Sequence, residues 1–349
     1  MQENSFYIKK VDFNKDSIKE FNTIIDVRSP KEFQEDSIPK AINYPVLNDD
    51  ERHKVGKIYS KNIFEARKIG AQIISKNISK ILKCLKINKS EKILIYCWRG
   101  GLRSLSLYLV LKNIGFDVQI LNKGYKSFRG HINAFFKKEI NESEFNILSG
   151  LTGSGKTFFL DNLSHKINII NLESLACHKG SILGNIPNIL QPSQKKFESS
   201  IWYELYKKSS IKKIWVESES NKIGNVSLPK LLFEKMLKGN ILKLNVPIDA
   251  RAKFIIKDYN YFVKNNEYLD HALDVLKKFI TFKEYKILIH NYKTKDFISF
   301  VRNLLIFHYD KAYNKRTHYC ESNQKTELEI KEVSIEKGDI ILNEMLSKF

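Results

Sequence analysis

One cysteine lies where the chain could make its sulfur reactive. Cys97 ends a short apolar run, residues 93–96, that predicts a buried strand, and the apolar spacing of residues 102–114 predicts a helix after the loop. The loop carries two glycines and two arginines: Gly100, Gly101, Arg99 and Arg103. Loop N–H groups, the start of the helix and the arginines all favour the ionised thiolate, the nucleophilic form of cysteine. We therefore predict that Cys97 is a catalytic nucleophile; the alternative is a small buried residue at a strand end.

A second stretch has the composition of a phosphate-binding loop. Residues 150–157 fit the pattern Gly-x4-Gly-Lys-Thr, with a predicted strand before them and a predicted helix after them. In this setting backbone N–H groups wrap a di- or triphosphate, Lys156 adds a positive charge, and the Thr157 hydroxyl can bind Mg²⁺. The predicted phosphate-binding residues are Gly150, Gly153, Ser154, Gly155, Lys156 and Thr157. The pattern does not say which phosphate is bound.

Other polar residues of the same region could assist that chemistry. Glu217 and Glu219 lie at the end of a strand expected over residues 213–219. Either could take the place of the acidic residue that follows a strand in other nucleotide-binding proteins and assists the metal. A surface glutamate at a strand end is the alternative. The usual aspartate is absent, which weakens the case for efficient ATP hydrolysis. His178 could serve as an acid or a ligand, and a structural histidine is the alternative.

Strands that alternate with helices must position these residues. The pattern predicts an α/β fold with parallel sheets covered by helices on both faces, and active groups lie at the carboxyl ends of such strands. We divide the chain into a first α/β domain (1–130), a linker (131–144), a phosphate-binding domain (145–247) and a helical region (248–349). A helix expected over residues 193–206 falls within the third segment.

The charge of the chain suggests a polyanionic partner. The net charge is +20, and Lys and Arg outnumber Asp and Glu by 25 to 14 in residues 1–130, 16 to 10 in 131–245 and 18 to 15 in 246–349. The excess therefore lies on the domains with candidate chemistry, which favours a nucleic acid, while a bias of composition is the alternative. The helical region interleaves basic and aromatic residues that could contact RNA or form a solvated face: Lys277, Lys278, Lys283, Lys286, Phe279, Phe282 and Tyr285.

Cysteine usage and hydropathy indicate the compartment. The four cysteines are scattered without a paired spacing, which argues against a disulfide framework and a zinc site and favours a reducing cytoplasm. The first residues lack the apolar core of a signal peptide, and no stretch approaches the length that spans a bilayer. We expect a cytoplasmic protein with no membrane partner.

The first domain resembles a rhodanese domain. The resemblance is carried by residues 26–33, residues 38–43 and the Cys97 loop. One departure concerns the loop, because five residues separate Cys97 from Arg103 where common single-domain rhodaneses have four. The longer loop also resembles the Cys-x5-Arg loop of dual-specificity phosphatases, and a wider loop would suit selenium or a phosphate-bearing donor.

Over nearly its full length, the chain resembles the tRNA 2-selenouridine synthase family, which joins a rhodanese domain to a P-loop. The stretches that carry the resemblance are residues 64–70, 96–104, 124–129, 150–157, 172–180, 191–194, 215–219 and 308–310. The resemblance implies an N-terminal rhodanese-like domain, a P-loop NTPase-like domain and a helical C-terminal region that contacts tRNA.

The resemblance also implies a two-step exchange on tRNA that carries 2-thiouridine at the wobble position. A geranyl group from geranyl diphosphate first alkylates the sulfur, and selenium from selenophosphate then replaces the S-geranyl group. Cys97 would carry selenium as a selenylated cysteine, Arg99 and Arg103 would hold the selenophosphate oxyanion, and the P-loop with Mg²⁺ would hold the diphosphate. The protein would be a transferase, with tRNA and a selenophosphate-supplying enzyme as partners.

Three alternatives stay open. An ATP-dependent tRNA sulfurtransferase would show tRNA-stimulated ATP hydrolysis. A Cys-x5-Arg phosphatase would need a general acid near the loop and would release phosphate from an aryl phosphate. A non-catalytic tRNA-binding module would need neither a thiolate nor a P-loop.

Overall fold

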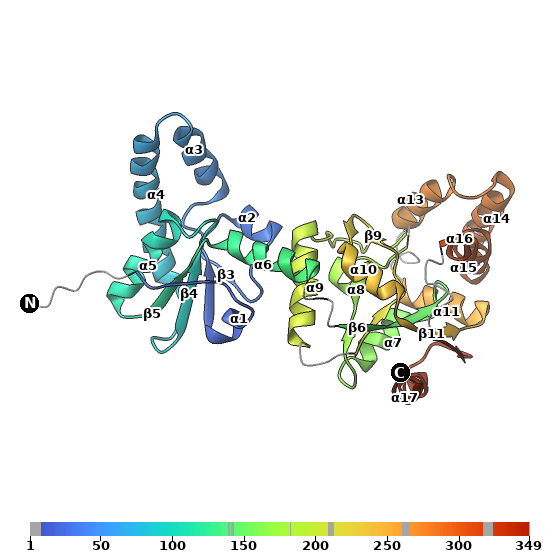
Figure 1. Ribbon diagram of the computed structural model, residues 1–349. Helices are drawn as coiled ribbons and strands as arrows, with labels where there is room; N and C mark the ends of the chain where they lie inside the picture. The colour runs from blue at the N-terminus through green and yellow to red at the C-terminus, as the bar shows by residue number, and fades with distance from the viewer. Residues whose placement is uncertain are drawn as a thin grey trace, which may run out of the picture. The chain divides into compact units, whose positions relative to one another are not determined.

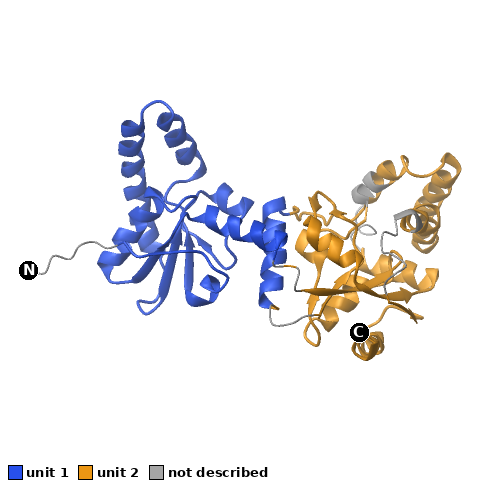
Figure 2. Cartoon of the chain, in the orientation of Figure 1, with its two compact units in different colours: residues 1–139, 192–207 blue, residues 140–191, 208–349 orange. Residues whose placement is uncertain are grey.

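The structure is a computed structural model that describes residues 8–138, 140, 143–181, 183–208, 213–259, 266–316 and 324–348 (Figure 1). The chain forms two compact units (Figure 2). Unit 1 comprises residues 1–139 and 192–207, and unit 2 comprises residues 140–191 and 208–349. Each unit contains its own five-stranded sheet.

The strands of unit 1 are all parallel. Their order is β1 (Lys10–Val11), β5 (Asp117–Leu121), β4 (Lys92–Tyr96), β2 (Thr23–Asp26) and β3 (Ile42–Asn43). The central strand β4 is buried along its last four residues, as its apolar run predicted. Cys97 follows directly, at the carboxyl end of the sheet, where parallel α/β folds place their active groups.

Helices cover this sheet, as the alternating pattern predicted. They are α1 (Ser17–Glu20), α2 (Pro30–Glu35), α3 (Asp49–Tyr59), α4 (Ile63–Cys84), α5 (Leu102–Ile114), α6 (Tyr125–Lys137) and α9 (Gln194–Lys207). The apolar faces of α4 and α5 join the strands in one core, which includes Ile74, Ile78, Ile81, Ile93, Ile95, Leu107 and Leu111. This packing fixes the start of α5 beside the Cys97 loop.

Helix α9 belongs to unit 1 although both of its flanking segments belong to unit 2. Arg129 of α6 forms an ion pair with Glu198 of α9 and hydrogen bonds to the Ser199 hydroxyl, and the rings of Phe128 and Trp202 lie 5.8 Å apart edge to face. The sequence pattern correctly predicted the helix but assigned it to the segment 145–247. Helical periodicity says that α9 has an apolar face, but not which unit that face covers.

Unit 2 also contains a fully parallel five-stranded sheet. Its order is β12 (Lys325–Glu329), β11 (Asn240–Asn245), β6 (Glu144–Gly150), β8 (Lys213–Glu217) and β7 (Ile169–Ile170). A separate antiparallel pair consists of β9 (Lys222–Ile223) and β10 (Val226–Ser227). The edge strand β12 lies in the region that we predicted to be helical, because its alternating charged residues give no apolar strand signal.

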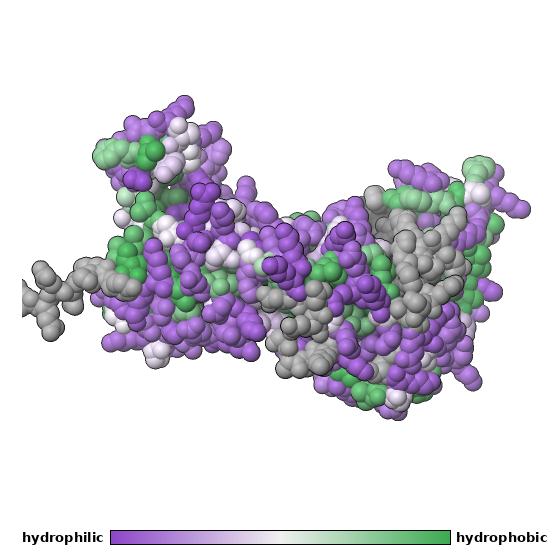
Figure 3. Space-filling view, in the orientation of Figure 1, coloured by the Kyte–Doolittle hydropathy of each residue, from purple (hydrophilic) through white to green (hydrophobic). Residues whose placement is uncertain are grey.

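Helices of unit 2 flank the sheet and form the predicted helical region. They are α7 (Lys156–Leu163), α8 (Leu172–Ala176), α10 (Lys230–Leu237), α11 (Ile248–Asp258), α13 (Asn266–Leu276), α14 (Phe282–Lys293), α15 (Phe297–Leu304), the π-helix η2 (Leu305–Tyr309), α16 (Asp310–Arg316) and α17 (Glu336–Lys348). Among the helices that the structure describes, none combines the length and apolarity needed to cross a bilayer. Figure 3 shows hydrophilic residues over most of the face in view.

Candidate functional site

The Cys97 sulfur lies in a compact loop at the end of β4. Cys97 is only 3% exposed. The Gly101 N–H donates a hydrogen bond to the sulfur at 3.2 Å, and the hydroxyl of Ser104 lies 3.3 Å from it. Gly101 is also the residue directly before α5, so the predicted strand, loop and helix all bear on one sulfur atom. Ser104 was not singled out by the sequence, because a serine in a first helical turn is common.

The two loop arginines lie in different surroundings. Arg103 forms an ion pair with Glu32 of α2, with 2.7 Å between Arg103 Nη1 and Glu32 Oε2. Burial raises the pKa of Glu32, but the hydrogen bond and charge of Arg103 outweigh burial and leave that pKa below its ordinary value. Arg99 is exposed. The carboxylate partner of Arg103 could not be found from the sequence, since it follows a different strand.

A buried carboxyl lies behind this loop. Asp36 accepts hydrogen bonds from the hydroxyls of Tyr125 and Ser199, and its carboxylate lies 3.6 Å from Arg129. Burial raises the pKa of Asp36, and these partners reduce the shift. The backbone N–H of Tyr125 donates to the Cys97 carbonyl at 2.8 Å, so Tyr125 connects this network to the Cys97 loop.

The P-loop has the strand–loop–helix setting that its sequence predicted, between β6 and α7. The Lys156 ammonium donates to the Gly150 carbonyl at 2.9 Å, across the loop itself. Gly153 has a φ of +83°, and a Cβ there would lie 2.7 Å from Ile255 of α11. Glycine is therefore required where α11 packs directly on the loop.

Three carboxyl groups gather beside the P-loop. The Thr157 hydroxyl donates to Glu173 Oε2 at 2.6 Å, and the Glu173 N–H donates to Glu217 Oε1 at 2.7 Å. A Cβ on Gly180 would lie within 2.9 Å of both Glu173 and Glu219. The sequence predicted Glu217 and Glu219 as acidic candidates but missed Glu173, whose position after the adjacent strand β7 was the available signal.

Burial controls the protonation of this cluster. It raises the pKa of Glu217 to about 8, and the charge of Glu173 adds to the shift. It also raises the pKa of Glu219 well above its ordinary value, again with Glu173 adding to the effect and Lys156 opposing it. Within the part of the chain that the structure describes, no group of three or more His, Cys, Asp or Glu side chains is placed to hold a metal ion.

Residues far along the chain fix the shape of the P-loop. Arg251 of α11 is almost fully buried, donates to the Thr152 carbonyl at 3.1 Å, and pairs through both terminal nitrogens with Asp310, each at 2.9 Å. Tyr313 of α16 lies 2.9 Å from the Ser149 hydroxyl. Sequence reasoning missed Arg251 and Tyr313, because neither lies in a recognisable motif.

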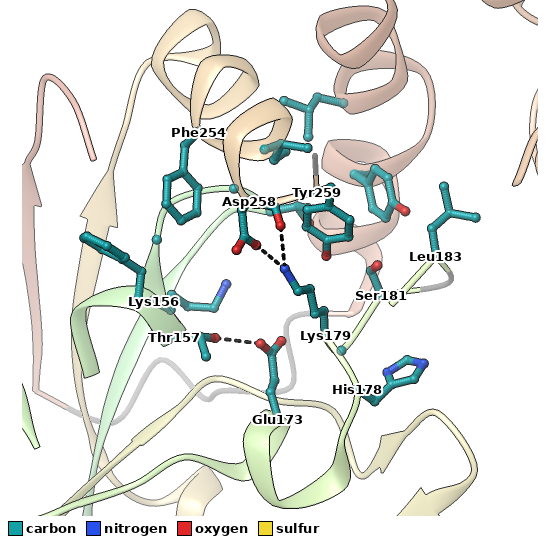
Figure 4. Close-up of a pocket in the computed structure, with 18 of the residues that line it drawn as sticks. Lys156, Thr157, Glu173, His178, Lys179, Ser181, Leu183, Phe254, Asp258 and Tyr259 are labelled. Atoms are coloured by element: carbon teal, nitrogen blue, oxygen red, sulfur yellow. Dashed lines mark hydrogen bonds and ion pairs between the residues drawn. The ribbon is translucent and has the colours of Figure 1, made fainter. Parts of the chain in front are cut away.

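A cavity of about 620 Å³ extends from the P-loop. At one end it is lined by Thr152, Gly153, Gly155, Lys156 and Thr157. The helical region contributes an apolar part of the remaining wall, including Phe254, Ile255, Phe297, Phe300, Val301 and Leu304, and polar side chains such as Glu173, Ser218 and Asp258 complete the lining. Phosphate-binding groups and apolar side chains therefore share one space (Figure 4).

Lys179 and His178 lie on the same cavity. Figure 4 shows the ammonium of Lys179 beside Asp258, where an ion pair of 2.6 Å joins them, and it also lies over the Tyr259 ring at 4.2 Å. His178 is 4% exposed. Burial lowers the pKa of His178, an effect that Glu173 partly opposes. Lys179 was part of a matched stretch of sequence but had no predicted role.

The predicted basic and aromatic residues of the helical region lie mainly at the surface. Lys286 lies over the ring of Phe282, which is 73% exposed, and Lys277 pairs with Asp274 at 2.9 Å. Lys278 and Lys283 are exposed. A surface of this kind could contact an RNA backbone, so contact with RNA stays a prediction.

Comparisons with known proteins cover both units. A family model described as the tRNA 2-selenouridine synthase AAA domain matches residues 143–335, and one for the rhodanese-like domain matches residues 11–131. A solved rhodanese-related protein from Thermoplasma volcanium covers 35% of this chain and 92% of its own, at 19% identity and a TM-score of 0.22.

Curated relatives carry the same family name. The protein named tRNA 2-selenouridine synthase from Nitrosomonas europaea is 32% identical over 68% of this chain and 63% of its own length. The protein of that name from Shewanella halifaxensis is 36% identical over 68% and 65%, so the matched stretch spans somewhat less than two thirds of these relatives. The protein of that name from Marinobacter nauticus is 32% identical over 76% of this chain and 77% of its own length. The chain belongs to the tRNA 2-selenouridine synthase family.

Proposed function

We propose that this protein is a transferase that converts 2-thiouridine at the wobble position of tRNA to 2-selenouridine. The reaction would pass through S-geranyl-2-thiouridine and use geranyl diphosphate and selenophosphate. The names of the relatives support the formation of 2-selenouridine in tRNA. A thione sulfur leaves poorly and an alkylated one leaves well, so alkylation would divide a difficult exchange into two easier steps.

The single observation that carries this proposal is the cavity that joins the P-loop to apolar walls. A prenyl diphosphate has a charged head and a hydrocarbon chain, and both halves find a matching lining here. Burying the chain away from water favours binding by about 25 cal/mol per Å² of apolar surface. A nucleoside triphosphate would place its polar ribose against aliphatic side chains such as Ile255, Val301 and Leu304, which favours the prenyl donor over ATP.

The P-loop residues would hold the diphosphate as it leaves. Lys156 would exchange the Gly150 carbonyl for a phosphate oxygen, and the loop N–H groups would bind the remaining oxygens. Mg²⁺ would be held at this end of the cavity by the Thr157 hydroxyl and by phosphate oxygens, which are the hard donors that it prefers. When bound, it would neutralise charge on the departing diphosphate.

The Cys97 loop would serve the selenium step. Cys97 would carry selenium as a selenylated cysteine, with the Gly101 N–H and the Ser104 hydroxyl beside its sulfur. Arg103 and Arg99 would attract the selenophosphate oxyanion, and Glu32 would hold Arg103 in place. Exposed lysines such as Lys283 and Lys286 would contact tRNA, and an enzyme that makes selenophosphate would supply the donor in the cytoplasm.

Mass spectrometry of nucleosides would test the proposal. A 2-thiouridine tRNA is incubated with the protein and geranyl diphosphate, selenophosphate, or both. We expect S-geranyl-2-thiouridine with the first donor alone and 2-selenouridine only when both are present. Absence of the geranylated nucleoside would rule out the prenyl assignment. ATP hydrolysis stimulated by tRNA would favour a sulfurtransferase instead, and phosphate release from an aryl phosphate would favour a phosphatase.

A further inference from the structure

A second cavity in unit 2 shares a wall with the first. It measures about 830 Å³. Five residues line both cavities: His178, Gly180, Ser181, Ser220 and Phe233. The two spaces therefore adjoin at these residues, and a molecule in one can meet a molecule in the other there.

The lining of the second cavity differs from that of the first. Outside the shared wall it is mainly polar, with amide and cationic side chains that include Asn185, Asn221, Asn225 and Lys222. Phe233 contributes a half-buried aromatic ring. Nucleobases taken out of RNA are recognised by stacking on aromatic rings and by hydrogen bonds to their edges. These are the two kinds of group that this cavity offers.

His178 is the titratable residue of the shared wall. It follows α8, and its backbone N–H donates to the Glu173 carbonyl at 3.1 Å. Its Nδ1 atom is buried and has no hydrogen-bond partner among the residues that the structure describes. A Cβ on Gly184 would lie 3.0 Å from this atom, so Nδ1 faces the turn at Gly184, a residue that lines neither cavity, while the rest of the imidazole lines both. Burial keeps the pKa of His178 low, which leaves the imidazole uncharged at neutral pH.

The proposed alkylation requires a proton acceptor. The bond between the sulfur of 2-thiouracil and the prenyl carbon forms while the carbon–oxygen bond to diphosphate breaks. The N3–H proton of the base must then leave, because C2 becomes doubly bonded to N3. This proton becomes more acidic as the sulfur gives up electrons, so a weak neutral base can accept it.

We propose that the second cavity receives the flipped-out pyrimidine and that the imidazole of His178 accepts its N3 proton as the sulfur attacks the prenyl carbon. The electron pair of the broken carbon–oxygen bond goes to diphosphate, and no oxidant or reductant is needed. This inference rests on the proposed prenyl transfer and adds to it a base-binding subsite and a catalytic residue.

The first test compares the full chain with its His178→Gln variant. Geranyl transfer to a 2-thiouridine anticodon stem–loop should fall about 100-fold or more at neutral pH, while binding of non-reactive geranyl thiolodiphosphate should change by less than about threefold. Above the pKa of the N3–H group, measured on the same RNA, the base arrives ionised. The ratio of the rate of the unchanged chain to the rate of the variant should then be at least tenfold smaller than at neutral pH.

Two results would overturn the role of His178. One is a His178→Gln rate within threefold of the unchanged chain at neutral pH. The other is a loss of the same size at every pH, which a merely structural histidine would produce. If the unchanged chain transfers no geranyl group, the proposed function fails; if it does and either result is found, only the further inference fails.

A second variant tests the base subsite independently of His178. Phe233→Ala should raise the KM for the RNA about tenfold, through lost stacking, and it should also raise the Kd of geranyl thiolodiphosphate, because Phe233 lines both cavities. Phe254→Ala is the matched control, since Phe254 lines only the first of the two cavities, and it should raise that Kd but leave the KM for the RNA unchanged. Equal effects of both variants on the RNA KM would contradict the assignment of the second cavity.

Discussion

The Cys97 loop of unit 1 and the P-loop of unit 2 both connect a parallel strand to the first turn of a helix, but their cations are held differently. Arg103 is bound to the carboxylate of Glu32 on another helix, whereas Lys156 is bound to the carbonyl of Gly150 within its own loop. A hydrogen bond between a charged group and a neutral acceptor contributes about 1.5–3 kcal/mol, and a partner of opposite charge holds the cation more strongly. Lys156 is therefore free to follow a phosphate, while Arg103 stays where Glu32 fixes it.

The two loops also differ in the space around them. The Cys97 sulfur is almost fully buried and already has a donor and a hydroxyl beside it. The P-loop opens into a cavity of about 620 Å³ with apolar walls. A fixed, tight loop suits one reacting atom, and an adjustable loop with a large cavity suits a long substrate. The predictions below separate these two roles.

The largest expected effect belongs to Cys97→Ser. Serine keeps the size of the side chain but removes the thiolate, so formation of 2-selenouridine should fall below detection. Geranyl transfer should keep at least half of its rate, because the P-loop is in the other unit. Nucleoside mass spectrometry with both donors measures the two products. Cys84→Ser, on the exposed end of α4, is the control and should change neither; selenation that survives Cys97→Ser would exclude Cys97 as the carrier.

The second largest effect is expected at Lys156, where geranyl transfer should be lost and the selenium exchange kept. Lys156→Ala removes a charge that would stabilise the leaving diphosphate, so geranyl transfer should fall about 10²–10³-fold. The exchange of pre-formed S-geranyl-2-thiouridine for 2-selenouridine should be unaffected, since it no longer needs the donor. Lys166→Ala is the control, because Lys166 forms an exposed ion pair with Asp339. If Lys156→Ala transfers geranyl groups normally, the diphosphate binds elsewhere.

The motifs and their flanking elements could be predicted from the sequence, because each depends on residues that are neighbours in the chain. The contacts that complete the sites could not. Glu173 reaches Thr157 only because β7 and β6 lie in one sheet, and Arg251 reaches the loop only because α11 packs on Gly153. The same reason explains α9, whose apolar face was visible but whose unit was not. Local patterns fix elements, and packing between distant elements decides which groups meet.

The third effect concerns the support of the P-loop. Arg251→Met should lower the free energy of unfolding of unit 2 by about 3 kcal/mol, because Asp310 and the Thr152 carbonyl lose a buried partner. Chemical denaturation followed by fluorescence measures this loss. Arg302→Met is the control: its ion pair with Asp249 spans 3.5 Å between side chains that are both more than half exposed, so its removal should cost less than about 1 kcal/mol. Equal losses would show that Arg251 is no special support for the loop.

The smallest effect compares the two buried carboxyls, and it concerns pH. Asp36 has two hydroxyl partners and a nearby arginine, whereas Oε2 of Glu217 has no hydrogen-bond partner among the described residues. Burial raises the pKa of Glu217 from 4.5 to about 8. Between these two pH values the folded chain keeps a proton that the unfolded chain loses, so this group makes the free energy of unfolding fall as pH rises. Above about pH 8 the group no longer changes the free energy of unfolding with pH.

Glu217→Gln should remove that slope, because glutamine keeps the acceptor for the Glu173 N–H but does not titrate. Between pH 6 and 7, without added Mg²⁺, the free energy of unfolding of the unchanged chain should fall by about 1.4 kcal/mol more than that of the variant. Glu234→Gln, at an exposed position on α10, should keep the slope of the unchanged chain. Parallel pH profiles for the unchanged chain and Glu217→Gln would mean that Glu217 is ionised in the folded protein. Its carboxylate would then add one negative charge to the cluster beside the P-loop before any phosphate binds.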